Sequence, residues 1–177
     1  PRPSDYLAGW VELNWANTLQ RWGDYTGALE AYDVAEARWG DSASPVDLAG
    51  LANNRGNTLG RLGRIDEAVE SFDQAITIWT EQVGAQHPLL AMAYMNRGSK
   101  LKERGDYEPA LADLERALAI DRAGLGDDHS YVAADLISIG ALAMRTRDLD
   151  GAAEAYSEAL EILERAHGED HPRIAGA

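Results

Sequence analysis

Residues 104–117 read RGDYEPALADLERA, and this stretch returns with conservative substitutions at three other places in the chain. The position of Gly105 in this stretch corresponds to Gly23, Gly63 and Arg147 in the other copies, and the four positions lie at intervals of 40, 42 and 42 residues. Self-similarity at a fixed period in this range is typical of proteins that stack one supersecondary unit several times. The sequence therefore predicts four copies of one unit, and the fold follows from what each copy forms.

Each copy is expected to form two helices. In the third copy, four residues of the first segment recur at the spacing of one helix face: Leu90, Tyr94, Gly98 and Leu101. After Gly105, Asp106 stands where a helix N-cap is expected, and a second apolar stripe follows it. The turn between the two segments is short, so the pair predicts an antiparallel helical hairpin.

The same columns of the four copies keep the same side-chain size. A small residue recurs in the first helix, at Ala16, Gly56, Gly98 and Gly140. A large residue recurs between two alanine columns of the second helix, at Tyr32, Phe72, Leu114 and Tyr156. Small residues let two helices approach closely while the large side chain fills the next groove, so these columns predict how each hairpin packs.

The ends of the helices recur as well. C-terminal caps are expected at Gly84, Gly126 and Gly168. The next helix is expected to begin at Pro45, Pro88, Ser130 and Pro172. In the first copy the second helix and its linker are shorter, which accounts for the interval of 40 residues.

Three histidines precede these helix starts, one copy apart: His87, His129 and His171. Neighbouring copies of a hairpin lie roughly 10 Å apart because of helix packing distances, whereas the ligands of one metal ion lie about 2 Å from it. We therefore expect each histidine to cap the next helix or to pack in the loop. We predict no metal site and no cofactor.

The columns of small residues, glycine, alanines, a large residue and proline resemble the tetratricopeptide repeat family over nearly the whole chain. The longer period and the linkers at 84–88, 126–130 and 168–172 resemble more closely the kinesin-light-chain type of the repeat. The resemblance implies an all-α, right-handed α-solenoid of four helical hairpins, a scaffold that hosts many functions. We expect a single domain over residues 1–177. Its repeats are expected at about 5–44, 45–87, 88–129 and 130–171, with the start of a truncated fifth repeat at 172–177.

Composition narrows the function. The 177 residues are 45% apolar, which is enough to fill a core, and carry a formal net charge of −14. Such a charge argues against nucleic acid and anionic membranes as partners, because both require a basic footprint. The chain contains no cysteine and no long apolar run, which fits a cytoplasmic protein. It also lacks a nucleophile elbow, a phosphate-binding glycine loop and an HExxH motif, so we expect no enzymatic activity.

The first helices differ from the rest of the chain in charge. Segments 5–22, 46–62, 89–104 and 131–147 together hold nine Lys or Arg and five Asp or Glu, a net charge of +4, which leaves −18 for the remainder. In the family that the chain resembles, the first helices line a concave groove. The resemblance therefore implies a relatively basic groove and an acidic outer surface.

Polar side chains recur in three columns of these first helices. Two columns carry amides and hydroxyls: Asn14, Asn54, Asn96 and Ser138 in one, and Asn17, Asn57 and Ser99 in the other. The third is cationic and contains Arg21, Arg61 and Arg145, with Lys102 beside an interrupting Glu103. Asparagine is a mediocre mid-helix residue, and its amide can bond the alternating polar groups of an extended peptide. We predict that these residues, with Asn53 and Trp10, bind a ligand, although the asparagines could instead bond neighbouring helices.

Three further features of the first helices leave room for interpretation. Trp10 either anchors a ligand residue, or covers the first repeat or contacts a preceding one. Arg55 and Arg97 either lay their stems over apolar surface, with the charged heads in water, or extend into the groove to meet acidic groups. Trp15 and Trp22 share a helix face with Leu19 and are expected to pack.

The sequence thus favours a protein–protein interaction module. Its groove is expected to bind a peptide or a segment of a partner protein, with an acidic motif as the ligand, and the module is expected to belong to a larger regulatory or signalling protein. The alternative is a structural module that self-associates through its open repeat ends. The clamp with which some tetratricopeptide adaptors hold acidic chaperone tails is not reproduced, because Leu13, Met92 and Asn96 stand where its cations would be expected.

Overall fold

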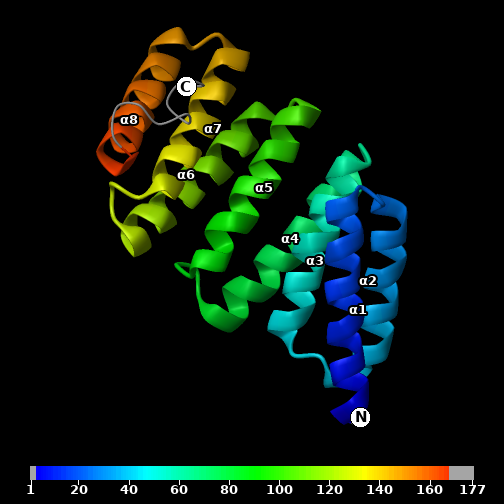
Figure 1. The fold of residues 1–177 in the computed structure, drawn as a ribbon. Helices are drawn as coiled ribbons and strands as arrows, with labels where there is room; N and C mark the ends of the chain where they lie inside the picture. Colours follow the sequence, from blue (N-terminus) through cyan, green and yellow to red (C-terminus); the bar gives the residue numbers. More distant parts are fainter. Residues whose placement is uncertain (1–2, 168–177) are drawn as a thin grey trace. The chain divides into compact units, whose positions relative to one another are not determined.

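The computed structural model describes residues 3–167, and every regular element in that range is helical. The first helices of the hairpins are α1 (Pro3–Trp22), α3 (Pro45–Arg61), α5 (Pro88–Arg104) and α7 (Ser130–Thr146). The second helices are α2 (Tyr25–Trp39), α4 (Ile65–Val83), α6 (Tyr107–Leu125) and α8 (Leu149–His167), and a 3-10 turn, η1 (Gly40–Ser42), follows α2. Each first helix packs along the second helix of its own hairpin (Figure 1). The predicted all-α class and the four hairpins are confirmed.

The hairpins gather into two compact units, each with its own core. Unit one (Pro1–Ala85) contains the first two hairpins, and unit two (Gln86–Ala177) contains the last two. That the whole chain forms a single domain stays a prediction.

Helix starts are fixed by side-chain caps. Ser44 Oγ accepts a hydrogen bond from the Asp47 backbone N–H at 3.1 Å, and the Asp47 carboxylate accepts one from the Ser44 N–H at 3.2 Å. This reciprocal capping box lies directly before Pro45, whose fixed φ suits the first position of α3. The repeated helix start predicted at Pro45 is therefore confirmed.

The histidines that precede the later first helices serve the same purpose. Nδ1 of His87 accepts a hydrogen bond from the Leu89 N–H at 3.3 Å, and Nδ1 of His129 accepts one from the Tyr131 N–H at 3.2 Å. Each imidazole satisfies a backbone donor that the first turn of a helix leaves unpaired. The predicted capping role is confirmed for these two histidines, and His171 lies outside the described residues.

Aspartates lie at the starts of three second helices, but they do not act alike. Asp24 and Asp148 accept hydrogen bonds from backbone N–H groups three residues later, both at 3.0 Å. Asp106 lies at the N-cap of α6 as predicted, yet its carboxylate bonds Nε of Arg104 at 2.5 Å and caps no backbone group. The predicted N-cap position is confirmed, but the neighbouring guanidinium engages the carboxylate in place of a backbone N–H.

Left-handed backbone ends the helices where the sequence predicts it. Gly84 and Gly126 cap α4 and α6 with φ of +89° and +86°, and the third predicted cap, Gly168, lies outside the described residues. Within the hairpins the turn uses Gly23, Gly63 and Gly105, and then Arg147 at φ +64°. Arg147 is the only non-glycine residue with positive φ in the described part of the chain. An L-residue in this conformation costs roughly 1 kcal/mol or more, a cost that glycine avoids.

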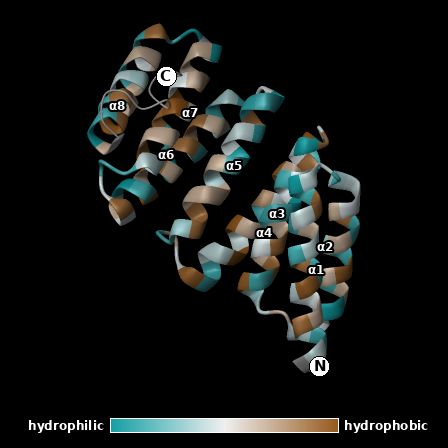
Figure 2. Ribbon diagram, in the orientation of Figure 1, coloured by the Kyte–Doolittle hydropathy of each residue, from teal (hydrophilic) through white to brown (hydrophobic). Residues whose placement is uncertain are grey.

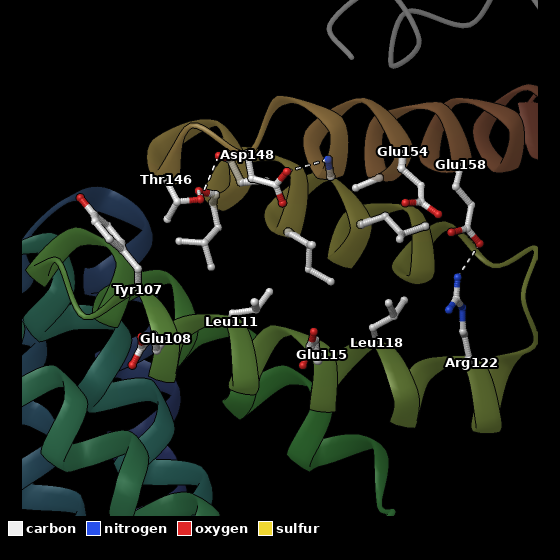
Figure 3. A pocket seen from close by; sticks show the side chains of 16 residues that line it. Tyr107, Glu108, Leu111, Glu115, Leu118, Arg122, Thr146, Asp148, Glu154 and Glu158 are labelled. Atoms are coloured by element: carbon white, nitrogen blue, oxygen red, sulfur yellow. Dashed lines mark hydrogen bonds and ion pairs between the residues drawn. The ribbon is translucent and has the colours of Figure 1, made fainter.

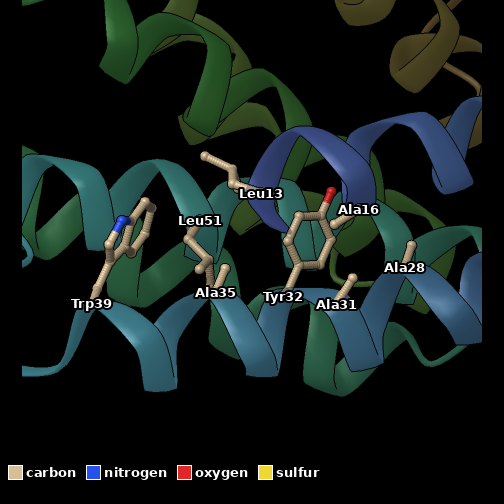
Figure 4. Close-up of a cluster of buried hydrophobic side chains, with 8 residues drawn as sticks. All are labelled: Leu13, Ala16, Ala28, Ala31, Tyr32, Ala35, Trp39 and Leu51. Carbon is tan, nitrogen blue, oxygen red and sulfur yellow. The ribbon is translucent and has the colours of Figure 1, made fainter. Parts of the chain in front are cut away.

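Unit one has a core of large side chains from α2 inserted between small ones. Figure 4 shows Tyr32 and Trp39 of α2 with Ala16 of α1 and Leu51 of α3, and all four are buried. In the second hairpin, a Cβ added to Gly56 would lie 2.7 Å from the ring of Phe72. Because each helix carries apolar residues on one side and polar residues on another, it buries one stripe (Figure 2).

Unit two repeats this packing with different large residues. Val132 and Leu136 of α7 are buried against Ile162 and Leu163 of α8. A Cβ on Gly140 would lie 2.9 Å from the ring of Tyr156. The predicted columns of small and large residues are thus confirmed in both units. So is the shorter second helix of the first repeat, since α2 has 15 residues and α4, α6 and α8 have 19 each.

The tryptophans of α1 fall into two groups. Trp10 is half-buried and packs edge-on against Trp39, with ring centroids 5.5 Å apart. Trp15 and Trp22 also pack on each other, at 5.9 Å, as expected. Their rings nevertheless remain 47% and 72% exposed, so this contact leaves an apolar surface on α1.

Candidate functional site

The polar columns of unit one form a hydrogen-bond network across three helices. Oδ1 of Asn17 in α1 accepts from the hydroxyl of Tyr32 in α2 at 2.8 Å and from Nδ2 of Asn54 in α3 at 3.2 Å. Burial raises the pKa of Tyr32, so its hydroxyl stays protonated and able to donate. The alternative in which asparagines bond neighbouring helices is therefore realised for Asn17 and Asn54.

A second set of hydrogen bonds also joins α1 to α3. Nε2 of Gln20 donates to Oγ1 of Thr58 at 2.8 Å, and that hydroxyl donates to the Asn54 backbone carbonyl at 3.1 Å. Thr58 is fully buried, so this bond joins α1 to α3 inside the unit. Asn17 and Asn54 are thereby held in fixed orientations. No other described residue bonds the NH₂ group of Asn17 or the amide oxygen of Asn54.

The cationic column of unit one borders a cavity. Arg21, Asn57 and Arg61 line a space of about 490 Å³ together with Gln20 and Tyr25. Both arginines are exposed, and neither forms an ion pair with a described residue. The structure therefore brings together three of the predicted site residues, with two guanidinium groups in position to receive anions.

The other predicted residues of unit one are engaged differently. Nδ2 of Asn14 donates to the backbone carbonyl of Trp10 one turn earlier, at 2.8 Å, and the side chain is exposed. Asn53 is only 2% exposed, which places it inside the unit. Trp10, as described above, packs against Trp39 of the same hairpin. Asn14, Asn53 and Trp10 are therefore engaged or buried within unit one, although the sequence predicts that they bind a ligand.

The predicted residues of unit two lie on α5 and α7. Asn96, Ser99 and Lys102 are half-buried on α5, and Arg145 is exposed near the end of α7. Oγ of Ser138 donates to the Ala134 carbonyl at 2.9 Å, so its donor is used within α7. Lys102 and Arg145 form no ion pair with a described residue.

Arg55 and Arg97 form ion pairs with carboxylates on the second helices of their own units. In unit two, the Arg97 guanidinium binds Asp113 of α6 through two bonds of 2.6 and 2.7 Å, and the carboxylate is almost fully buried. In unit one, Arg55 pairs with Asp33 and Glu36 of α2. Both arginines therefore bind carboxylates of second helices, and neither predicted alternative, with the heads in water or extended into the groove, describes them. Their charges cross-link helices and add little to the basic character of the first helices.

A pair of buried carboxyl groups in unit two was not anticipated. Asp135 of α7 is 0% exposed, and Asp121 of α6 is 6% exposed. Burial, together with repulsion from Asp121, raises the pKa of Asp135 to about 7, and burial also raises the pKa of Asp121. The repeat columns carry a signal for this pair, because Asp121 occupies the column of Trp39 and Trp79.

In residues 3–167, no group of three or more His, Asp or Glu side chains could share a metal ion. No described helix combines the length and the apolar run that crossing a bilayer requires.

Two models of the tetratricopeptide repeat match residues 47–123 and 136–173. The chain belongs to the tetratricopeptide repeat family. The Arabidopsis thaliana protein KINESIN LIGHT CHAIN-RELATED 1 is 33% identical over 73 residues, which span 41% of this tetratricopeptide chain and 12% of the relative. The predicted resemblance to kinesin-light-chain repeats is confirmed.

Solved structures show the same fold. BtubC (BKLC) from P. vanneervenii matches with a TM-score of 0.83 at 24% identity, over 91% of this chain and 65% of that one. The apo form of RapI matches with a TM-score of 0.83 at 16% identity, over 96% of this chain and 60% of that one. The fold is thus a tetratricopeptide α-solenoid. Such repeats generally mediate protein–protein interactions and are generally not enzymes.

Proposed function

We propose that the first-helix faces of this tetratricopeptide chain bind an extended segment of a partner protein that carries an acidic motif. The observation that supports this most is the cavity lined by Arg21, Asn57 and Arg61. Its two arginines have no ion-pair partner among the described residues, whereas Arg55 and Arg97 are paired. An arginine fork matches a carboxylate with two parallel hydrogen bonds, so the cavity favours Asp or Glu side chains.

The amides beside this cavity would hold the backbone of the segment. Asn17 and Asn54 are fixed by each other and by Tyr32, which lowers the entropy lost when they bind a peptide. The NH₂ group of Asn17 and the oxygen of Asn54 offer one donor group and one acceptor to the alternating groups of an extended chain. On α5 and α7, Asn96, Ser99, Lys102 and Arg145 form the corresponding face of unit two.

Binding, and no catalysis, is the function that we assign to the chain. The two carboxyl groups with raised pKa values, those of Asp121 and Asp135, are buried and offer no surface to a substrate. A role within a larger regulatory or signalling protein in the cytoplasm agrees with such a binding module.

A charge-reversal experiment tests the proposed site. The double variant Arg21→Glu and Arg61→Glu should bind a Glu-rich extended peptide at least tenfold more weakly than the unaltered chain, which corresponds to about 1.4 kcal/mol. The remaining binding should depend less on salt. The control, Arg38→Glu with Arg165→Glu, changes the net charge equally on second helices. Equal affinities for the first variant and the unaltered chain would contradict the proposal.

Self-association is a second candidate function, favoured by one surface of α1. Leu7, Val11, Trp15 and Trp22 share a helix face and are 47% to 72% exposed. The residue of α3 in the column of Val11 is Leu51, which is buried against α2. The face of α1 therefore suits a second helix supplied by another copy of the chain. Sedimentation over a range of concentrations should show growth in mass that Val11→Lys with Trp15→Lys abolishes, and a constant mass would contradict it.

A further inference from the structure

Unit two contains a cleft of about 530 Å³ between α6 and α8, with α7 as its floor (Figure 3). The apolar side chains that line it come mainly from α6 and α7: Leu111, Leu118, Leu136, Ile139 and Leu142. The volume lies within the range of pockets that enclose small ligands or clusters of side chains. The cleft lies apart from the polar columns of α5 and α7 described above.

Carboxylates line both walls of this cleft. Glu108 and Glu115 stand on α6, and Asp148, Glu154 and Glu158 stand on α8 or at its start. The only cation among the lining residues is Arg122, which already pairs with Glu158 and lies 3.5 Å from Asp127. Glu108, Glu115 and Glu154 form no ion pair with a described residue. The walls therefore carry negative charge that the unit does not neutralise.

The corresponding cleft of unit one shows how the same place is neutralised internally. It measures about 370 Å³ and is lined by residues in the same repeat columns. Arg55 stands where Ile139 lies in unit two, and Arg64 stands where Asp148 lies. Arg55 pairs with Asp33 and Glu36 of α2, and Arg64 pairs with Glu67 of α4. Unit one therefore supplies the two cations that unit two lacks.

We propose that the unit-two cleft binds a cationic amphipathic helix of a partner protein. Its apolar side chains would lie against Leu111 of α6 and against Ile139 and Leu142 of the α7 floor, and its Lys or Arg residues would meet the carboxylates of both walls. The partner thereby supplies the charge that Arg55 and Arg64 provide within unit one.

The spacing of the carboxylates supports a helical partner. Glu108 and Glu115 are seven residues apart on α6, which places them about 10 Å apart along that helix. Basic residues seven apart on a bound helix match this distance, and an apolar stripe between them matches the floor. The charge is opposite to that of the partner proposed for Arg21 and Arg61, so the two sites select different ligands.

A binding experiment on the full chain tests the proposal. The probe is a fluorescent amphipathic peptide of leucine and lysine, about 18 residues long, so that helix formation is not prohibitive. We expect saturable binding with one peptide per chain, and about tenfold weaker binding after Ile139→Arg, because the new guanidinium fills the floor and pairs with Glu115. Circular dichroism establishes that the variant is folded.

A double variant removes charge from the walls of the cleft and leaves its apolar floor unchanged. Glu115→Gln with Glu154→Gln should weaken binding by about tenfold and reduce its salt dependence, because both carboxylates are exposed wall groups. The matched control is Glu67→Gln with Glu70→Gln in the unit-one cleft, which should leave binding unchanged. Equal weakening by both pairs would mean that the peptide follows net charge alone, and that result overturns the proposal. Unchanged binding by Glu115→Gln with Glu154→Gln overturns it as well.

Discussion

The two units place opposite chemistry in the same repeat columns. In unit one the cleft between second helices contains the paired Arg55, and the core contains Trp39 and Leu51. In unit two the cleft column holds Ile139, while the core columns hold Asp121 and Asp135. Charge and apolar surface have thus been exchanged between core and cleft. The hairpins tolerate this exchange because the small and large residues that pack their two helices together, such as Gly56 with Phe72 and Gly140 with Tyr156, are kept in both units.

The exchange makes unit two sensitive to pH, and this is the largest effect that we predict. Folded Asp135 keeps its proton up to about pH 7, whereas an ordinary aspartate releases it near 3.8. Between these values the folded state binds more protons than the unfolded state, so the free energy of unfolding falls as pH rises, by up to roughly 4 kcal/mol in total. Asp135→Asn should remove most of this slope.

The position of the tryptophans allows the two units to be followed separately. All five tryptophans lie in unit one, so their fluorescence reports its unfolding, while circular dichroism reports both units. Urea unfolding at pH 4.5 and pH 7.5 should show the pH dependence in the circular dichroism signal and not in the fluorescence. The control Asp33→Asn, an exposed carboxylate of unit one, should leave the slope intact. A slope that survives Asp135→Asn would contradict the assignment.

Both units pack a glycine of a first helix against an aromatic ring of the second helix, and the second prediction concerns this contact. A Cβ at Gly56 would lie 2.7 Å from the ring of Phe72, and one at Gly140 would lie 2.9 Å from the ring of Tyr156. Gly56→Ala and Gly140→Ala should each destabilise their unit, by about 1–3 kcal/mol. The loss should be larger for Gly56, because Phe72 is fully buried and has less room to move than the half-buried Tyr156.

Glycines in open positions provide the matched control for this prediction. Nothing lies within 4 Å of a Cβ at Gly50 in α3 or at Gly124 in α6. Alanine at either site should raise stability by about 0.5–1 kcal/mol through its helix propensity. Stability would be measured by urea unfolding at constant pH. If Gly56→Ala were as favourable as Gly50→Ala, the close approach of α3 and α4 would be wrong.

A smaller effect than that of Gly56→Ala is predicted at the last hairpin turn. Arg147 adopts φ +64°, a conformation that glycine occupies at the equivalent turns of the other repeats. Arg147→Gly should therefore stabilise unit two by roughly 1 kcal/mol, since it removes the strain of a left-handed arginine. A rise in the melting temperature of unit two, followed by circular dichroism, is the measurement. The reverse change in unit one, Gly63→Arg, should lower stability by a similar amount.

The sequence was sufficient for the fold because the fold depends on recurring size. Gly56 and Gly140 stand in one column of the repeat, and each meets a large ring where the pattern predicts one. Capping by His87 and His129 could be predicted for the same reason. The pairing of the Asp106 carboxylate with Arg104 could not be predicted, because Arg104 is a local feature of one turn.

The site could be predicted only in part, because hydrogen bonds between helices depend on pairs of residues and not on columns. The sequence identified Asn17 and Asn54 but not that they bond each other. It identified Arg55 as unusual but not its pairing with α2. The buried pair Asp121 and Asp135 carried a column signal, since an acid replaces a tryptophan, but its raised pKa follows only from burial in the packed unit.

One measurement tests most directly whether the cleft chemistry is set by these exchanged positions. The double variant Arg55→Ile with Arg64→Asp gives the unit-one cleft the residues of unit two while leaving Asp33, Glu67 and Glu70 in place. Isothermal titration with the leucine–lysine peptide should then show two binding sites per chain in place of one. A stoichiometry that stays at one would contradict the claim that these two positions decide whether a cleft neutralises itself or binds a cationic partner.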